Sequence, residues 1–423
     1  MMKVFVLLTA ILTLSNIVLA QDENIFLTRE YWKAKPALEK VKADIAKGNS
    51  PSELDRYDFD ATGWAILEDT DDTILKFIIE QDGNDVNKLT HDGRTYIFWA
   101  AYKNKLSLMN YLIERGARTD IIDSHGYSLV NFCAVTGQLN TNIYDLCIDK
   151  GAVLNEELNG DGANPLLLLA SFIENEDQIS YFTDKGLVLN SLDSKGNNAF
   201  VYAAKSGNMF MMKLLLKLNM DARANNDAAF FYAAQGMRRK PNKLPVFKYL
   251  ESLGLDIHAQ NKENQNLLHF LSRSNKDTVL LKYLVFKGVS FNHKDKEGLS
   301  PVSVAVERKN MAALDLYNAV NADFSVVDNE GSTLVHKALK HEDWEIMDLI
   351  LKHDLDINQK NKDGMTPLHL AAMSGENINF IKSMLVAGAD KMATTQFGEN
   401  AYELAIENEL MNKNPEDLKI LVP

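Results

Sequence analysis

The sequence has few basic residues relative to acidic ones, only two cysteines, and no long apolar run beyond its N-terminus. Lys and Arg number 45 against 58 Asp and Glu, which gives a net charge of −13. Nucleic acids and anionic membranes present phosphates that require a basic footprint, so this balance argues against nonspecific binding to either. No later segment is long and apolar enough to cross a bilayer, and the mature chain is expected to lack a membrane span.

Enzyme motifs are missing as well. The chain has no HExxH motif, no P-loop, no G-x-G-x-x-G fingerprint and no G-x-S-x-G elbow. Loops such as Asp193–Gly196 resemble fragments of calcium loops but lack the alternating oxygen ligands and the distant Glu of an EF-hand. The sequence therefore predicts no catalytic residues, no cofactor and no metal site. An enzyme site hidden in the irregular sixth repeat is a weaker alternative, because that segment has no nucleophile–base set.

The first twenty residues have the pattern of an export signal. Lys3 precedes a mostly apolar stretch that ends at a small residue, Ala20. A positive start, an apolar centre and a small residue at the cleavage point are typical of a secretory signal peptide. A membrane anchor is the alternative, but the stretch is short and polar residues interrupt it. We predict that residues 1–20 are a signal peptide and that the mature chain is periplasmic or secreted.

What the sequence does contain is a repeat of about 33 residues. A Ser, Thr or Asn recurs at ten of eleven positions, and its side-chain oxygen can accept the first free N–H groups of a helix. Gly or Asn mostly lies two residues earlier, as a tight turn requires. Paired small residues then fall in a first helix, and a second helix usually ends in Gly. The eleven positions are Thr62, Thr95, Ser128, Asn164, Asn198, Ala228, Asn266, Ser300, Thr333, Thr366 and Asn400.

The stretch KDGMTPLHLAAMSG, Lys362–Gly375, shows the pattern most clearly and resembles the ankyrin repeat. The resemblance covers the chain from about Asp58 to its C-terminus. It implies an all-α solenoid of helix-turn-helix units with short β-hairpins, which binds a protein partner through the concave surface of hairpin tips and first helices. Exported bacterial ankyrin-repeat proteins are the best resemblance, and some of them are associated with stress protection.

We expect residues 21–57 to form an N-terminal capping helical segment and residues 58–423 to form the repeat domain. A helix with Leu38, Val41 and Ile45 on one face would cover the first repeat, and the tail would cover the last. The sixth repeat, about residues 225–261, is irregular. Its neighbouring spacings of 30 and 38 sum to twice 34, so a shortened hairpin and a lengthened loop should leave the stack continuous.

The resemblance places candidate binding residues beside the turn glycines and after the paired small residues. Aromatic residues are favoured as interface anchors, and a row of basic residues in repeats five to nine would attract an acidic partner. Single Lys or Arg residues commonly only solvate a surface. The groove candidates are His91, Arg94, Tyr102, Lys103, His125, Tyr127, Phe172, Lys205, Arg273, Arg308 and Lys340, and the inserted loop adds Arg238, Arg239, Lys240 and Lys243.

Two sets of reactive residues have structural explanations. Cys133 and Cys147 fall at core positions of repeat three, where a disulfide can form in an oxidising compartment. Two buried thiols are the favoured alternative, because the spacing between helices often exceeds disulfide reach. His269, His336 and His369 recur at the fourth position of the Thr-Pro-Leu-His slot on separate repeats. We predict that they hydrogen-bond within the turn–helix framework and bind no metal.

These observations favour a monomeric, non-catalytic scaffold outside the cytoplasm that binds a protein. A secreted effector or toxin component that acts on host proteins is the alternative. It would be supported by a translocation signal or a toxin domain, and we identify neither.

Overall fold

The computed structural model describes residues 24–237, 240–274, 277–411 and 413–422. The predicted signal peptide, residues 1–20, and the loop residues Arg238 and Arg239 therefore lie outside the described residues. The described chain divides into two compact units, one ending at Ala152 and the other beginning at Val153. None of the described helices is both long and apolar enough to cross a bilayer.

The first unit consists of helix pairs arranged in two rows. In the first-helix row, α3 packs against α1 and α5, and α5 packs against α7, while α2 packs against α4 in the second-helix row. The first-helix row contains α1 (Arg29–Lys33), α3 (Ala61–Leu67), α5 (Tyr96–Tyr102) and α7 (Leu129–Val135). The second-helix row contains α2 (Leu38–Ala46), α4 (Asp72–Ile79), α6 (Leu106–Glu114) and α8 (Thr141–Asp149), and two 3-10 turns are η1 (Ile25–Leu27) and η2 (His91–Gly93).

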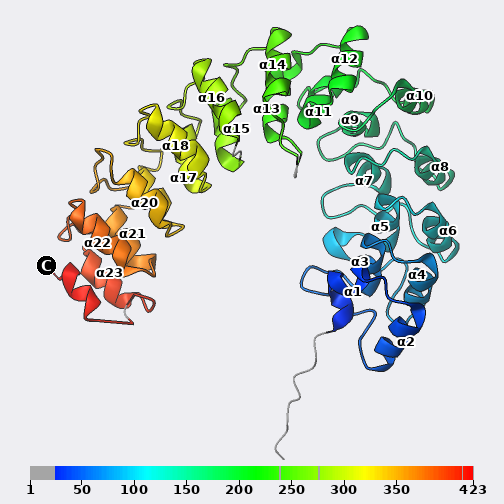
Figure 1. The fold of residues 1–423 in the computed structure, drawn as a ribbon, viewed down its shortest axis with the longest axis horizontal. Helices are drawn as coiled ribbons and strands as arrows, with labels where there is room; N and C mark the ends of the chain where they lie inside the picture. The colour runs from blue at the N-terminus through cyan, green and yellow to red at the C-terminus, as the bar shows by residue number, and fades with distance from the viewer. Residues whose placement is uncertain (1–23, 238–239, 275–276, 412, 423) are drawn as a thin grey trace, which may run out of the picture. The chain divides into compact units, whose positions relative to one another are not determined.

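The second unit repeats this arrangement, and each first helix packs against the next from α9 to α23 (Figure 1). Its first-helix row contains α9 (Pro165–Leu169), α11 (Ala199–Ser206), α13 (Ala224–Gln235), α15 (Leu267–Ser274), α17 (Pro301–Glu307), α19 (Leu334–Leu339), α21 (Pro367–Ser374) and α23 (Ala401–Glu407). Its second-helix row contains α10 (Glu176–Asp184), α12 (Met209–Lys217), α14 (Leu244–Ser252), α16 (Thr278–Phe286), α18 (Met311–Ala319), α20 (Trp344–Ile350), α22 (Ile378–Val386) and the 3-10 turn η3 (Asp417–Leu421). The predicted all-α solenoid is confirmed.

Most of the predicted cap residues begin first helices. Their side-chain oxygens accept backbone N–H groups of the first turn, which contributes about 1 kcal/mol per helix. The residues that do so are Ser128, Asn164, Asn198, Asn266, Ser300, Thr366 and Asn400. The position given to the first cap is wrong by two residues. The carboxylate of Asp60 accepts the N–H of Gly63 at 2.8 Å, whereas Thr62 lies inside α3.

The turns between helix pairs form fingers that are less sheet-like than the expected β-hairpins. In the part of the chain that the structure describes, pairing within these fingers is limited to single bridges such as Thr90–Arg94 and Val327–Thr333. Neighbouring fingers are joined by the backbone, as where the N–H of Lys362 donates to the Glu330 carbonyl at 2.8 Å. Gly331, at φ 75°, permits this approach, because a Cβ there would lie 3.1 Å from the Cα of Asn361 in the next finger.

Both ends of the described chain bury apolar side chains against the terminal repeats. Helix α2 packs on α4 and buries Val41, and η1 and α1 pack on α3 and bury Phe26 and Trp32 completely. At the other end η3 packs on α22 and α23 and buries Leu418 and Leu421. The aromatic pair at the N-terminal end was not anticipated from the sequence.

The stack is continuous through the irregular sixth repeat, as predicted, because α13 packs against both α11 and α15. The inserted loop contributes to this packing through Asn242, whose side chain is buried. Its Nδ2 donates to the carbonyls of Ala204 at 3.1 Å, Lys205 at 2.9 Å and Ala233 at 3.0 Å. One side chain thereby bonds C-terminal carbonyls of two neighbouring helices, α11 and α13.

Candidate protein-binding face

The finger face is the surface formed in each unit by the finger tips and the exposed sides of the first helices. In the first unit it carries aromatic residues, but one predicted groove residue is engaged inside the fold. The side chain of Arg94 is 11% exposed and bonds Asp92 at 3.0 Å and Asp123 at 2.8 Å. Its guanidinium also lies 4.6 Å from the ring centre of Phe132, so Arg94 has a structural role.

The other candidates of the first unit differ in how freely they reach solvent. His91 stacks on Phe59, and its Nδ1 lies 2.8 Å from the Tyr57 carbonyl. Lys103 forms an ion pair with Asp69 at 2.6 Å. Tyr102 is 46% exposed, which leaves just under half of its surface available for a partner. His125 is exposed at a finger tip, 3.2 Å from the Asp92 carboxylate, and Tyr127 beside it is partly buried.

In the second unit the predicted basic row lies at the C-terminal ends of successive first helices. Arg273, Arg308 and Lys340 are exposed there, at the ends of α15, α17 and α19. Lys205, at the end of α11, is only partly exposed, and burial lowers the pKa of its ammonium group despite the opposing charge of Asp161. Phe172 follows α9 and is partly buried.

The basic inserted loop is less free than the sequence suggested. Lys243 forms an ion pair with Asp277 at 3.1 Å, at the residue that caps α16. Lys240 is exposed and closes the loop through a bridge to Met237. Of the four predicted basic residues of this loop, only these two lie within the described residues.

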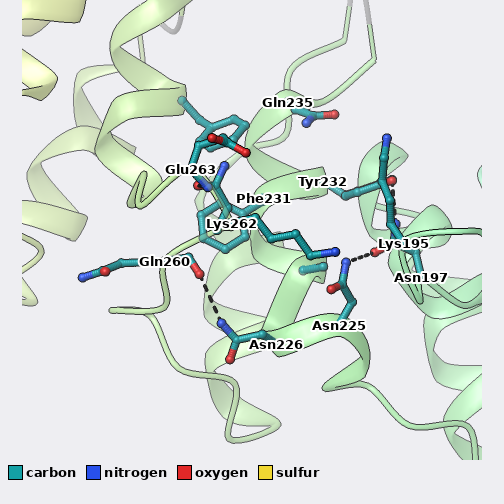
Figure 2. Close-up of a pocket in the computed structure, with 13 residues that line it drawn as sticks. Lys195, Asn197, Asn225, Asn226, Phe231, Tyr232, Gln235, Gln260, Lys262 and Glu263 are labelled. Atoms are coloured by element: carbon teal, nitrogen blue, oxygen red, sulfur yellow. Dashed lines mark hydrogen bonds between the residues drawn. The ribbon is translucent and has the colours of Figure 1, made fainter. Parts of the chain in front are cut away.

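A pocket opens on the finger face at the sixth repeat, and we call it the sixth-repeat pocket (Figure 2). It encloses about 520 Å³ between the fifth and seventh fingers, above α13 and α15. The sixth finger is shortened, so it leaves a recess where the other repeats place a full turn. The pocket is lined by Lys195, Asn197, Asn225, Asn226, Ala228, Phe231, Tyr232, Gln235, Gln260, Asn261, Lys262, Glu263 and Phe270.

The shortened finger has an unusual backbone. Asn225, Asn226 and Asp227 follow one another in the left-handed region, with φ between 50° and 59°. This conformation costs about 1–2 kcal/mol for an ordinary residue and less for Asn or Asp, whose short polar side chains bond locally. Such strain persists only where surrounding contacts hold it, and it often marks a functional site.

Side-chain amides hold this turn in place of backbone bonds between fingers (Figure 2). On one side Nδ2 of Asn225 donates to Oδ1 of Asn197 at 2.8 Å, and on the other Nδ2 of Asn226 donates to the Gln260 carbonyl at 3.1 Å. Asp227 is buried and accepts the backbone N–H of Asp256 at 2.9 Å as well as two bonds from Arg223. The sixth finger is therefore fixed at both edges before any partner binds.

Tyr232 and Asn197 form the polar wall of the pocket. Nδ2 of Asn197 donates to the Tyr232 hydroxyl at 2.9 Å and to Asp193 at 2.8 Å. Burial, with the nearby Asp193 carboxylate, raises the pKa of Tyr232 to about 12, so the phenol is neutral at physiological pH. The wall thus presents neutral hydrogen-bonding groups and no nucleophile.

Replacing Asn225 tests how the strained finger is held. Asn225→Ala removes the bond to Asn197 and places an ordinary residue in the left-handed region, so we expect a loss of about 2 kcal/mol of unfolding free energy. Asn225→Gly loses the same bond, but glycine adopts the left-handed conformation without strain. Its unfolding free energy should therefore be about 1 kcal/mol higher than that of Asn225→Ala. Urea unfolding followed by circular dichroism measures both. Equal losses for the two variants would show that the conformation of Asn225 carries no strain.

The three histidines of the slot have the structural role predicted for them. Nδ1 of His336 accepts the backbone N–H of Thr333 at 3.1 Å, and its Nε2 lies 3.1 Å from the carbonyl of Met365 in the next finger. His269 and His369 make the equivalent pair of bonds, one to the cap residue of their own helix and one to a carbonyl of the following repeat. Each ring is neutral, joins a helix start to the next repeat, and is unavailable as a ligand.

Cys133 and Cys147 are both buried, and the structure holds them as thiols. Burial raises the pKa of the Cys133 thiol, and the neighbouring Cys147 adds to the effect. Within the ranges that the structure describes, no group of three or more His, Cys, Asp or Glu side chains is placed to hold a metal ion.

The comparisons with known proteins agree with the fold. Residues 309–395 match the family model described as ankyrin repeats in three copies. An ankyrin repeat protein of fowlpox virus, FPV034, is 26% identical over 62% of this chain and 51% of its own length. An ankyrin repeat protein of Acanthamoeba polyphaga mimivirus, L371, is 25% identical over 55% of this chain and 31% of its own length. The phosphocholine transferase AnkX of Legionella pneumophila is 22% identical over 52% of this chain and 21% of its own length.

The chain is thus an all-α repeat solenoid in which residues 309–395 match ankyrin repeats, and such repeats indicate a scaffold for protein–protein interaction. It spans about half the length or less of the relatives named above. The sequence interpretation missed the sixth-repeat pocket, although the spacing of 30 residues before Ala228 is the signal of the shortened finger that forms it.

Proposed function

We propose that this protein is a non-catalytic scaffold that binds a protein partner through its finger face. The observation that supports the proposal most directly is the finger face of the second unit, where exposed cations at the ends of α15, α17 and α19 accompany the sixth-repeat pocket. Cations in a row accelerate the encounter with an acidic surface and disfavour basic partners. Aromatic and amide groups in a recess supply the short-range contacts.

We also propose that the scaffold works outside the cytoplasm, after cleavage near Ala20. The apolar stretch between Lys3 and Ala20 supports this proposal. N-terminal sequencing of the protein from its native fractions would test it. A mature chain that begins at Gln21 in an exported fraction is expected, and an intact Met1 in the cytoplasm would contradict it.

Affinity capture from the native exported fraction tests the binding face. The chain is compared with a variant that carries Arg273→Glu, Arg308→Glu and Lys340→Glu. A matched control carries Lys213→Glu, Lys282→Glu and Lys382→Glu, which are exposed residues of the second-helix row. Both variants change the net charge by −6, so they differ only in the face that is altered.

We expect a partner that wild type and control retain and that the finger-face variant loses, with affinity reduced about tenfold or more. Loss in both variants would show a general charge effect, and retention in both would remove the finger-face cations from the proposal.

A further inference from the structure

We propose that the sixth-repeat pocket binds an extended segment of the partner, with an apolar side chain over Phe231 and Phe270 and an acidic side chain beside Lys262. The inference rests on the proposed function, because it names the element of the partner that this part of the finger face would hold. It assigns a ligand chemistry to the recess that the irregular sixth repeat forms.

The floor of the pocket is aromatic. The rings of Phe231 and Phe270 lie 5.3 Å apart between centres at 53°, and they come from adjacent first helices, α13 and α15. Phe231 is buried and Phe270 is partly exposed. Part of the Phe270 ring therefore faces the recess, although neither ring is fully exposed to solvent. Binding of an apolar side chain against these rings would remove apolar surface from water, which is favourable. The volume of about 520 Å³ is large enough for one such side chain and the peptide backbone on either side of it.

The walls carry amides that suit a peptide backbone. Asn225 and Asn226 use their Nδ2 groups on the neighbouring fingers, and no described residue donates to either Oδ1. Gln260 and Gln235 add further amides at the rim. An amide offers a donor and an acceptor side by side, as a peptide group does. Packed helices lie roughly 8–10 Å apart and an extended peptide advances about 3.3 Å per residue, so about three residues of a bound segment span one repeat.

The charges that line the pocket favour an acidic residue next to the apolar residue of the bound segment. Lys195 is neutralised by Asp161 at 2.9 Å, and Glu263 lies 3.8 Å from Lys296. Lys262, which extends across the recess in Figure 2, has no carboxylate within 4.0 Å among the described residues.

Arg273 adds a second positive charge beside the floor, since its guanidinium lies 5.9 Å from the ring centre of Phe270. An acidic side chain next to the apolar anchor would meet these two cations. A basic side chain at the same place would be repelled.

Fluorescence anisotropy with labelled eight-residue peptides tests the proposal on the purified full chain. Each peptide carries one Phe, with Glu one to four residues after it, in a Ser/Gly background. Control peptides replace Phe by Ser or Glu by Lys. Lys262→Glu reverses the charge in the pocket, and Gln235→Trp fills it from an exposed rim position. Lys282→Glu and Lys282→Trp make the same changes on the exposed face of α16 and serve as matched controls.

We expect at least one spacing to bind with a Kd of about 100 μM or tighter, and both control peptides to bind at least about tenfold more weakly. Lys262→Glu should weaken binding about tenfold and Gln235→Trp should abolish it, while the Lys282 variants bind as wild type does.

Three results would overturn the inference. The first is that no peptide of the set binds at about 1 mM. The second is that the pocket variants bind the peptides as the Lys282 variants do. The third is that N-acetyl-phenylalaninamide binds as tightly as the peptides, which would assign the pocket to a small apolar ligand. The first two results, together with a partner captured through Arg273, Arg308 and Lys340, would leave the scaffold intact and remove only the pocket.

Discussion

Lys337→Ala is expected to destabilise the second unit by about 3 kcal/mol or more, the range for removing one partner of a buried ion pair. The Lys337 side chain is 6% exposed and bonds Asp328 at 2.6 Å and Glu307 at 2.8 Å. Burial alone would lower the pKa of Lys337, but its hydrogen bonds to Asp328 and Glu307 outweigh burial and raise it. The ammonium group therefore joins α17, the ninth finger and α19, and its loss leaves a buried carboxylate without a counter-charge.

Three further variants separate charge from packing. Lys337→Met keeps most of the apolar stem and should still lose stability, because Asp328 stays buried and charged. Adding Asp328→Asn should recover part of that loss, since the amide oxygen can still accept the N–H groups of Glu330 and Ser332. Lys340→Ala, on an exposed residue three positions later, should change stability by less than about 0.5 kcal/mol. Urea midpoints measure all four, and a Lys337→Met variant as stable as wild type would contradict the pairing.

The period and the cap residues predicted most of the fold because each repeat forms its turn and its two helices from the same local sequence features. A capping side chain, a left-handed Gly and a helix with small residues are visible in the sequence whatever the neighbours are. The slot histidines followed from the same logic, since a residue that recurs at the same position of separate repeats is explained by stacking.

One periodic signal was available in the sequence and was not used. In nine of the repeats a side-chain oxygen five residues before the cap accepts the N–H groups two and four residues further on, which closes the finger. It comes from Asp55, Asp123, Asn159, Asp193, Asn261, Asp295, Asp328, Asn361 and Thr395. Asp55 would have placed the first cap at Asp60, and Arg223 at this position in the sixth repeat would have indicated that its finger is rebuilt.

The parts of the site that the sequence could not supply depend on side chains from different repeats. Arg94 was assigned to a free groove, but two carboxylates and two aromatic rings engage it. The pocket floor pairs Phe231 with Phe270, which are 39 residues apart and meet only because the stack remains continuous across the inserted loop. Repeat period fixes which elements are neighbours, and the exceptions to the period decide where a specific ligand can fit.

Lowering the pH from 7.5 to 5.5 should destabilise the second unit through its structural histidines. Burial lowers the pKa of His269, His336 and His369 below 6.5, because each ring is enclosed and its Nδ1 must accept a backbone N–H. Above pH 6.5 the rings are neutral in both states and their contribution to stability is complete. Below pH 6.5 the unfolded chain takes up protons that the folded chain does not, so stability falls as the pH drops towards the lowered pKa values.

Each such residue can contribute at most about 1.4 kcal/mol per pH unit, so three give a slope of up to about 4 kcal/mol per unit in this window. His353, which is stacked on Phe324 and also has a lowered pKa, adds in the same direction. Urea unfolding at pH 7.5, 6.5 and 5.5 measures the slope before most carboxylates titrate. His336→Gln should lower stability at pH 7.5 and reduce the slope by one residue's share, because Gln takes up no proton in this window. If His336→Gln kept the wild-type slope, protonation of the His336 ring would not contribute to the loss of stability at low pH. Other bonds of the repeat would then have to hold the start of α19 to the next finger.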